Sequence, residues 1–255
     1  MRIYDIIKKK RDGFTLSKEE IEFLKANLNN ITEEEYCNFK FYVYLATINN
    51  INTLLMINLD SILFNIETCK RAPQAGALLV SEPFLREPYF CHSVISLVEY
   101  EIGKSSMGIV MNKPTSYTLG EVIERIDDDN ETLIYCGGPL SCDRLYFLHT
   151  IGDIIPKSRE IIEGLYIGGD FDTMIDIVNS GYDIEGKMRF FIGYSGWDAG
   201  QLESELRQNV WAVTDIPDMT NVLIGEKDNY WHRHVRHMGE RYRHWRYHPE
   251  NPILN

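Results

Sequence analysis

The side chains that could perform chemistry in this chain lie beside glycine-rich segments. Ser195 sits in a segment that resembles the G-x-S-x-G nucleophile elbow, but Trp197 replaces the second glycine of that motif. A serine nucleophile also needs a histidine and a carboxylate within reach. His149 is the main internal candidate, although it belongs to an apolar run where a structural histidine is common. A helix-capping hydroxyl is the simpler role for Ser195.

Two pairs of adjacent glycines, 31 residues apart, interrupt the chain in similar contexts. Gly137 and Gly138 follow Cys136, and the second pair is Gly168 and Gly169. Paired glycines allow positive φ angles and the close approach of a strand or a ligand, and their N–H groups can form an anion nest. Neither pair fits a Walker or dinucleotide fingerprint. We therefore favour tight turns that let sheet segments cross, and we interpret Cys136 as an inert thiol.

The acidic and histidine-containing segments predict neither a metal site nor a bound cofactor. The acidic run at residues 127–130 lacks the ligand spacing and the terminal glutamate of an EF-hand. His234 and His237 have the spacing of helical metal ligands, but we favour adventitious metal capture over a dedicated site as the explanation of such a pair. His92 follows Cys91 directly, and strand neighbours point to opposite faces, so these two side chains are not expected to act together.

Charge is distributed unevenly along the 255 residues, whose formal net charge is −12. Residues 56–230 carry 13 basic and 28 acidic side chains, whereas residues 231–255 carry 5 and 2. Nonspecific nucleic-acid binding depends on neutralising phosphates with lysine and arginine, so a body with a charge of −15 opposes it. We therefore do not expect direct nucleic-acid binding.

Cysteine usage and hydropathy indicate a cytoplasmic protein. The five cysteines include no CxxC pair, and no cleavable signal pattern opens the chain, so reduced thiols are expected. The most apolar early run, residues 39–48, is too short to span a bilayer, and we expect no membrane insertion.

The chain is predicted to consist of a helical leader, residues 1–55, and a mixed helix and strand domain, residues 56–255. Capping boxes that begin at Ser17 and Thr32 predict the helices of the leader. In the domain, helices are expected after Thr118 and near Asp172. Short apolar runs predict strands at residues 77–80, 93–98, 107–111, 132–135, 145–149 and 165–167.

The segment 189–206 carries the most specific local signal. Residues 190–194 have the aromatic and branched character of a strand, and Ser195 and Asp198 have the spacing of a capping box. The chain is therefore predicted to reverse direction around residues 193–197 and to enter a helix there.

A C-terminal helix is predicted at residues 229–247. Its outer face would carry Arg233 and His237. Its apolar stripe, which must dock on the domain or on a partner, is spaced at four, three, four and three residues: Trp231, Val235, Met238, Tyr242 and Trp245.

Five segments match one known pattern in order: residues 81–84, 107–114, 135–139, 166–170 and 189–206. With them, residues 56–255 resemble the AlgH (YqgE) family of bacterial proteins. The resemblance implies an α+β domain whose bifurcated sheet curls into a pseudo-barrel with flanking helices. Some members are labelled transcriptional regulators, but the family has no agreed reaction or ligand. Residues 1–24 resemble the N-terminal helical segment of pyrimidine-nucleoside phosphorylases, whose glycine-rich phosphate loop has no counterpart here.

Two functional hypotheses follow, a non-catalytic binding or regulatory protein and an unrecognised hydrolase or transferase for a small anionic substrate. We favour the first, with a protein or a small anionic ligand as partner and self-association as an option. An enzyme needs a nucleophile or base within about 3 Å of its partner group, whereas a binding surface needs only complementary groups. The turns are expected to converge on one surface built from Asn112, Gly137, Gly138, Gly168, Gly169, Tyr194, Ser195, Gly196, Trp197 and Gln201.

Overall fold

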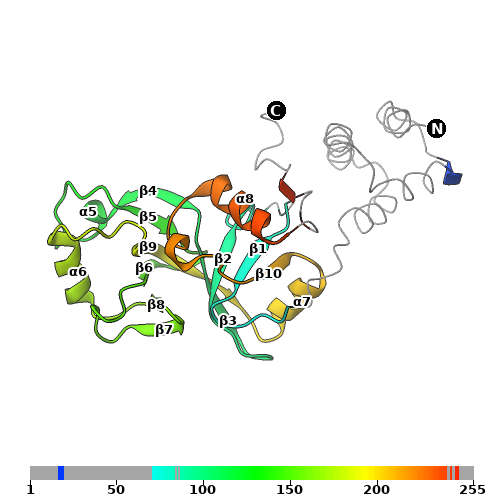
Figure 1. Cartoon of the computed structure of the whole chain (residues 1–255), viewed down its shortest axis with the longest axis horizontal. Helices are drawn as coiled ribbons and strands as arrows, with labels where there is room; N and C mark the ends of the chain where they lie inside the picture. Colours follow the sequence, from blue (N-terminus) through cyan, green and yellow to red (C-terminus); the bar gives the residue numbers. More distant parts are fainter. Residues whose placement is uncertain are drawn as a thin grey trace. The chain divides into compact units, whose positions relative to one another are not determined.

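The computed structural model describes residues 17–19, 71–83, 85, 87–239, 242, 245 and 246 (Figure 1). All but the first three of these belong to the unit Thr68–Glu250. The predicted helical leader, residues 1–55, lies outside the described residues except for 17–19. Within the described part of the chain, no helix is both long enough and apolar enough to cross a membrane.

One ten-stranded, mostly antiparallel sheet organises this unit. Eight strands follow the order β10-β1-β2-β3-β9-β6-β8-β7, while β5 pairs with β9, and β4 with β5. The strands are β1 (Leu78–Ser81), β2 (Val94–Glu99), β3 (Ser106–Val110), β4 (Pro114–Thr118), β5 (Leu133–Cys136), β6 (Leu140–His149), β7 (Arg159–Ile162), β8 (Leu165–Ile167), β9 (Met188–Trp197) and β10 (Trp211–Thr214).

The flanking helices divide between the two ends of the sheet, as Figure 1 shows. They are α5 (Leu119–Val122), α6 (Phe171–Asn179), α7 (Gln201–Arg207) and α8 (Lys227–His237), with a 3₁₀ turn η2 (Met219–Asn221). Each predicted strand run overlaps a strand of the structure, and the predicted α+β class is confirmed.

The sheet divides at β9. Residues 190–192 of β9 pair in parallel with β5, whereas residues 195–197 pair antiparallel with β3. The other edge of β9 pairs with β6. Since β5 and β3 share one edge of β9 and separate near Gly193, the sheet is bifurcated.

The predicted chain reversal at residues 193–197 is wrong. β9 continues to Trp197 because Ser195 pairs with Gly108 of β3. Helix α7 begins only after Gly200, whose left-handed φ of 78° makes the turn. Ser195 is therefore a strand residue and not a helix cap, and the distant pairing with β3 outweighs the local capping pattern.

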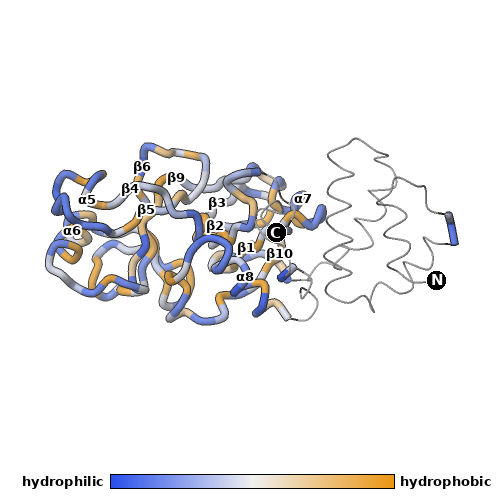
Figure 2. The backbone as a smooth tube through the Cα atoms, turned by 90° about the horizontal axis from the view of Figure 1, so that it is seen from above, coloured by the Kyte–Doolittle hydropathy of each residue, from blue (hydrophilic) through white to orange (hydrophobic). Residues whose placement is uncertain are grey.

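Two hydrophobic clusters lie at the two ends of the unit. One joins α5 and α6 to the sheet and contains Phe147 of β6 and Phe190 of β9. The other joins β1, β2, β3 and β10 to α7 and contains Leu79 and Trp197. Figure 2 shows hydrophobic segments in both halves. Strand β9 contributes side chains to both clusters and so connects the two ends of the unit.

The predicted terminal helix is shorter than residues 229–247. Helix α8 ends at His237, and Gly239, with a φ of 91°, breaks it. Trp231 and Val235 are nevertheless fully buried, and the remainder of the predicted stripe is half-buried or buried beyond the helix.

The helical periodicity predicted that Arg233 lies free on the outer face of the helix, and this prediction is wrong. Its guanidinium donates to the carbonyl oxygens of Asn221 at 3.0 Å and Ile224 at 2.6 Å, and it lies over the ring of Tyr230. Arg233 thus ties α8 to the preceding loop. His237 is exposed, as predicted.

Candidate functional site

The first glycine pair lies where the sheet divides. A Cβ atom on Gly138 would lie 2.3 Å from the backbone of Tyr194, and one on Gly137 would lie 2.3 Å from the carbonyl oxygen of Gly193. The backbone N–H of Gly137 already donates to Ile192 at 2.8 Å. These glycines let two backbones pass in contact, and the Gly137 N–H is not available to a free anion.

Ser195 also belongs to this crossing. Its hydroxyl is buried and donates to the carbonyl oxygen of Gly137 at 3.2 Å. Gly196 packs against the side chain of Leu140. The structure therefore brings Gly137, Gly138, Ser195 and Gly196 together, as packing groups.

The second glycine pair lies elsewhere, beyond β8 on the opposite edge of β9 from β5. The Gly168 N–H donates to Phe147, and the Gly168 carbonyl accepts from the Nε2 atom of His149 at 2.9 Å. Gly169 packs directly against the side chains of Ile155 and Ser158. The two glycine pairs do not share one turn surface.

Asn112 is fully buried and holds three backbone groups. Its Oδ1 atom accepts from Val94, and its Nδ2 atom donates to the carbonyl oxygens of His92 and Lys227, both at 2.8 Å. It fastens the start of α8 to the turn before β2. Its role is structural.

The last three predicted site residues lie around β9 and α7. Trp197 is buried and donates to Glu205 at 2.8 Å, and the exposed Gln201 donates to the same carboxylate at 2.8 Å. Tyr194 is half-buried and packs edge-on against Tyr146.

The groups that a hydrolase would combine are engaged separately. Ser195 bonds to Gly137, and Asp170 caps α6 and pairs with Lys157 at 2.7 Å. Burial raises the pKa of the Cys136 thiol, which keeps it protonated. In the described part of the chain these side chains make no nucleophile–base contact with His149.

His149 is a buried structural histidine. Its Nε2 atom lies 2.9 Å from the carbonyl oxygen of Gly168 and 3.0 Å from the Ser158 hydroxyl, which identifies Nε2 as the protonated nitrogen. Its Nδ1 atom is buried without a partner among the described residues. Burial lowers the pKa of His149 and keeps the imidazole neutral.

We expect the thermal stability to fall as the pH drops below 6.5, the ordinary histidine pKa. The folded state keeps His149 neutral, whereas the unfolded chain takes up a proton, so this contribution is present above that pH and is lost below it. Melting temperatures at about pH 7.5 and about pH 5 measure the loss. His149→Gln should reduce the difference, and the exposed His237→Gln control should not; an unchanged difference in His149→Gln would contradict this assignment.

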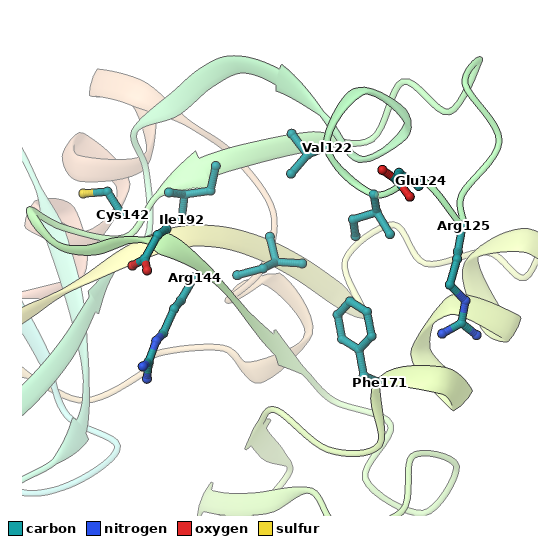
Figure 3. A pocket seen from close by; sticks show the side chains of 10 residues that line it. Val122, Glu124, Arg125, Cys142, Arg144, Phe171 and Ile192 are labelled. Atoms are coloured by element: carbon teal, nitrogen blue, oxygen red, sulfur yellow. The ribbon is translucent and has the colours of Figure 1, made fainter.

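An open groove lies between helices α5 and α6 and the strands β6 and β9 (Figure 3). Its volume is about 400 Å³, and Leu145 of β6 and Ile192 of β9 contribute to its lining. Val122 of α5 and Phe171 of α6 line it as well and remain 43% and 44% exposed. These side chains extend the first hydrophobic cluster out to the solvent.

Charged side chains line the same groove. Arg125 pairs with Asp172 at 2.6 Å, which neutralises its charge. Arg144 extends from β6 on the other side of the groove from Phe171 (Figure 3) and forms no ion pair with any described residue. Glu124 and Asp143 line the groove as well and, like Arg144, form no ion pair with any described residue. The groove thus combines exposed apolar surface with unpaired charges of both signs. Sequence periodicity could not reveal it, because its residues come from four separate elements, α5, β6, α6 and β9.

A second cavity, of about 590 Å³, contains the buried Arg189. Its guanidinium donates to the carbonyl oxygens of Met111 and Gly225, both at 2.8 Å, and lies over the ring of Tyr135. Because its donors serve the backbone, we interpret Arg189 as a structural cation.

Comparisons with known proteins agree on one family. The family model described as AlgH-like matches residues 78–243. A UPF0301 protein of Parabacteroides distasonis is 40% identical over 184 residues, covering 72% of this chain and 92% of the relative. A UPF0301 protein of Bacteroides thetaiotaomicron is 34% identical over 199 residues, covering 78% of this chain and all of the relative.

Solved structures share the fold. The AlgH protein from Pseudomonas aeruginosa is 28% identical with a TM-score of 0.53, covering 67% of this chain and 92% of that protein. A crystal structure from Corynebacterium diphtheriae is 21% identical with a TM-score of 0.56, covering 73% of this chain and 97% of that protein, which shows likeness of fold alone.

Proposed function

The chain belongs to the AlgH-like family, and we propose that it is a non-catalytic binding protein whose partner occupies the groove between α5, β6 and α6. The observation that carries this proposal is the exposure of Val122 and Phe171 in the same groove as Arg144, which forms no ion pair with any described residue. Exposed apolar surface in a concave site favours binding, and the charged side chains of Arg144, Glu124 and Asp143 around it would orient the partner.

The matching partner is a protein segment that carries an apolar side chain and a carboxylate. The apolar side chain would cover Phe171 and Val122, and the carboxylate would pair with Arg144 in a charge-assisted hydrogen bond. The acidic body of the chain repels polyanions. We therefore propose that any regulatory role of the protein runs through a protein partner and not through direct contact with DNA.

The separate engagement of Ser195, His149 and Cys136 supports a binding role over a hydrolytic one. Each polar atom satisfies a backbone carbonyl of its own surroundings. Catalysis at these positions would require those contacts to be exchanged for new ones.

We expect Phe171→Ser and Arg144→Glu to leave the fold nearly unchanged, each altering the free energy of unfolding by about 1 kcal/mol or less, because both side chains are exposed. The double variant should nevertheless lose at least about tenfold in partner capture. Affinity capture from the cells that produce the chain, with quantitative comparison against the unmodified bait, measures this.

Ile102→Ser is the matched control, since Ile102 is 79% exposed and lies outside the groove. This variant should capture the same partner as the unmodified chain. Equal capture by the groove variants would contradict the proposed site. A hydrolytic activity lost in Ser195→Ala at unchanged stability would contradict the non-catalytic role.

A further inference from the structure

A compact cluster of His92, Asp228 and His232 joins two distant segments of the chain. His92 lies in the turn before β2, and the other two residues lie on α8, one helical turn apart. Asp228 contacts the Nδ1 atom of His92 through Oδ1 and the Nε2 atom of His232 through Oδ2, the latter at 3.0 Å. One ligand atom from each residue lies within 4.8 Å of the other two.

The surroundings fix the orientation of His92. Its carbonyl accepts from Asn112 at 2.8 Å, and its ring stacks on Trp231 with 4.0 Å between the ring centroids and 9° between the planes. Its backbone φ of 47° is unusual for a residue other than glycine. The ring is therefore held in one position, as a ligand on a rigid support would be.

The hydrogen-bond pattern of His92 leaves a place for a cation. The Nε2 atom lies 3.3 Å from the carbonyl oxygen of Pro83, which can accept only from a protonated nitrogen. In the neutral ring, Nδ1 then presents a lone pair to the carboxylate of Asp228. Two acceptors that face each other need a positive charge between them, either a proton or a metal ion. A metal-ligating histidine commonly donates its other N–H to a carbonyl or carboxylate in this way.

The cluster opens to solvent on one side. The side chain of His92 is 1% exposed, whereas that of Asp228 is 31% exposed and that of His232 is partly exposed. An ion could therefore enter past Asp228, and water or another ligand could complete its coordination.

We propose that His92, Asp228 and His232 bind one divalent transition-metal ion of the Zn²⁺ type and leave a coordination position open. Two imidazole nitrogens and one carboxylate oxygen suit Zn²⁺, which often keeps three protein ligands and one exchangeable position. The sequence alone predicted no metal site because His92 and Asp228 are 136 residues apart and meet only in the fold.

The required rearrangement centres on Asp228. Neighbouring ligands of a tetrahedral Zn²⁺ ion lie roughly 3.4 Å apart when each bond is about 2.1 Å. The Oδ2 atom of Asp228 lies 3.0 Å from the Nε2 atom of His232, close to that spacing, whereas the other oxygen, Oδ1, contacts His92. The three candidate ligand atoms lie within 4.8 Å of one another, and rotation of the partly exposed Asp228 side chain would bring one oxygen within reach of an ion that both imidazoles bind.

Titration of the metal-free full-length chain with Zn²⁺, without a polyhistidine tag, tests the site by calorimetry. We expect one ion per chain and a higher melting temperature with Zn²⁺. Asp228→Asn and His232→Gln should each weaken binding at least about tenfold. His237→Gln is the matched control, because His237 is exposed on the same helix outside the cluster, and it should bind as the unmodified chain does.

A second measurement uses only the unmodified chain, in case a variant fails to fold. In ¹H–¹⁵N spectra of the histidine rings, Zn²⁺ should shift Nδ1 of His92 and Nε2 of His232. No Zn²⁺ binding, or equal weakening in His237→Gln, would overturn the proposal. So would unshifted His92 and His232 nitrogens in the presence of bound Zn²⁺, which would leave the cluster as a hydrogen-bonded fastening of α8.

Discussion

Gly138→Ala is expected to lower the free energy of unfolding by about 3 kcal/mol or more. The backbone of Gly138 has a φ of 149°, which side-chain-bearing residues rarely adopt. An added Cβ would also meet the backbone of Tyr194 at 2.3 Å, and a strand backbone cannot turn aside as a flexible side chain can. Urea or guanidinium denaturation of the variant and the parent measures the difference.

Gly168→Ala is the control for this prediction. Gly168 also has a positive φ, 65°, but a Cβ added there would meet no atom within 4 Å. Only the conformational cost should remain, about 1 kcal/mol. Equal losses in the two variants would show that the crossing of backbones at Gly138 is looser than the structure indicates.

Trp231→Ala is expected to cost about 4 kcal/mol of unfolding free energy. The indole is fully buried, it stacks on His92, and its Nε1 atom donates to the carbonyl oxygen of Ser81 at 3.1 Å. Truncation leaves a cavity and removes the donor to the carbonyl oxygen of Ser81 at the C-terminal end of β1. Deletion of residues 227–255 removes α8 entirely and should leave an aggregating or unfolded chain.

Arg236→Ala provides the comparison, since Arg236 lies exposed on the same helix. Its free energy of unfolding should stay within about 0.5 kcal/mol of the parent. A deletion variant that remained a stable monomer would contradict the expected result and would assign α8 to a partner instead of to the sheet.

Sequence reasoning identified the strands well because their apolar runs reflect burial directly. It missed β4 and β7, which are mostly exposed or half-buried, and it also missed β10, a four-residue strand that is mostly buried. It also placed a helix cap at Ser195, because the local Ser–Asp spacing is indistinguishable from a capping box. Only the pairing with β3, from residues far away in the chain, decides that β9 continues.

The site residues also divide into those whose role the sequence predicts and those whose role depends on the fold. Crossing of backbones was the preferred interpretation of Gly137 and Gly138, and the structure has that arrangement, because glycine pairs report backbone proximity. Whether Arg144 forms an ion pair depends on which side chains surround it in the fold. The contact between His92 and Asp228 likewise forms only in the fold. No local sequence spacing predicts either feature.

Strand β9 has a consequence for synthesis of the chain on the ribosome. It forms hydrogen bonds with β3, β5 and β6, and β10 then pairs with β1, the first strand of the sheet. Both strands lie late in the sequence, so neither half of the domain can close while residues 188–214 are still inside the exit tunnel. Strands β1, β2 and β3 can pair with one another early, but the other edge of β1 must wait for β10 and the other edge of β3 for β9. Nascent chains are therefore expected to expose the unpaired edges of β1 and β3 until β9 and β10 emerge, and such edges favour incorrect association.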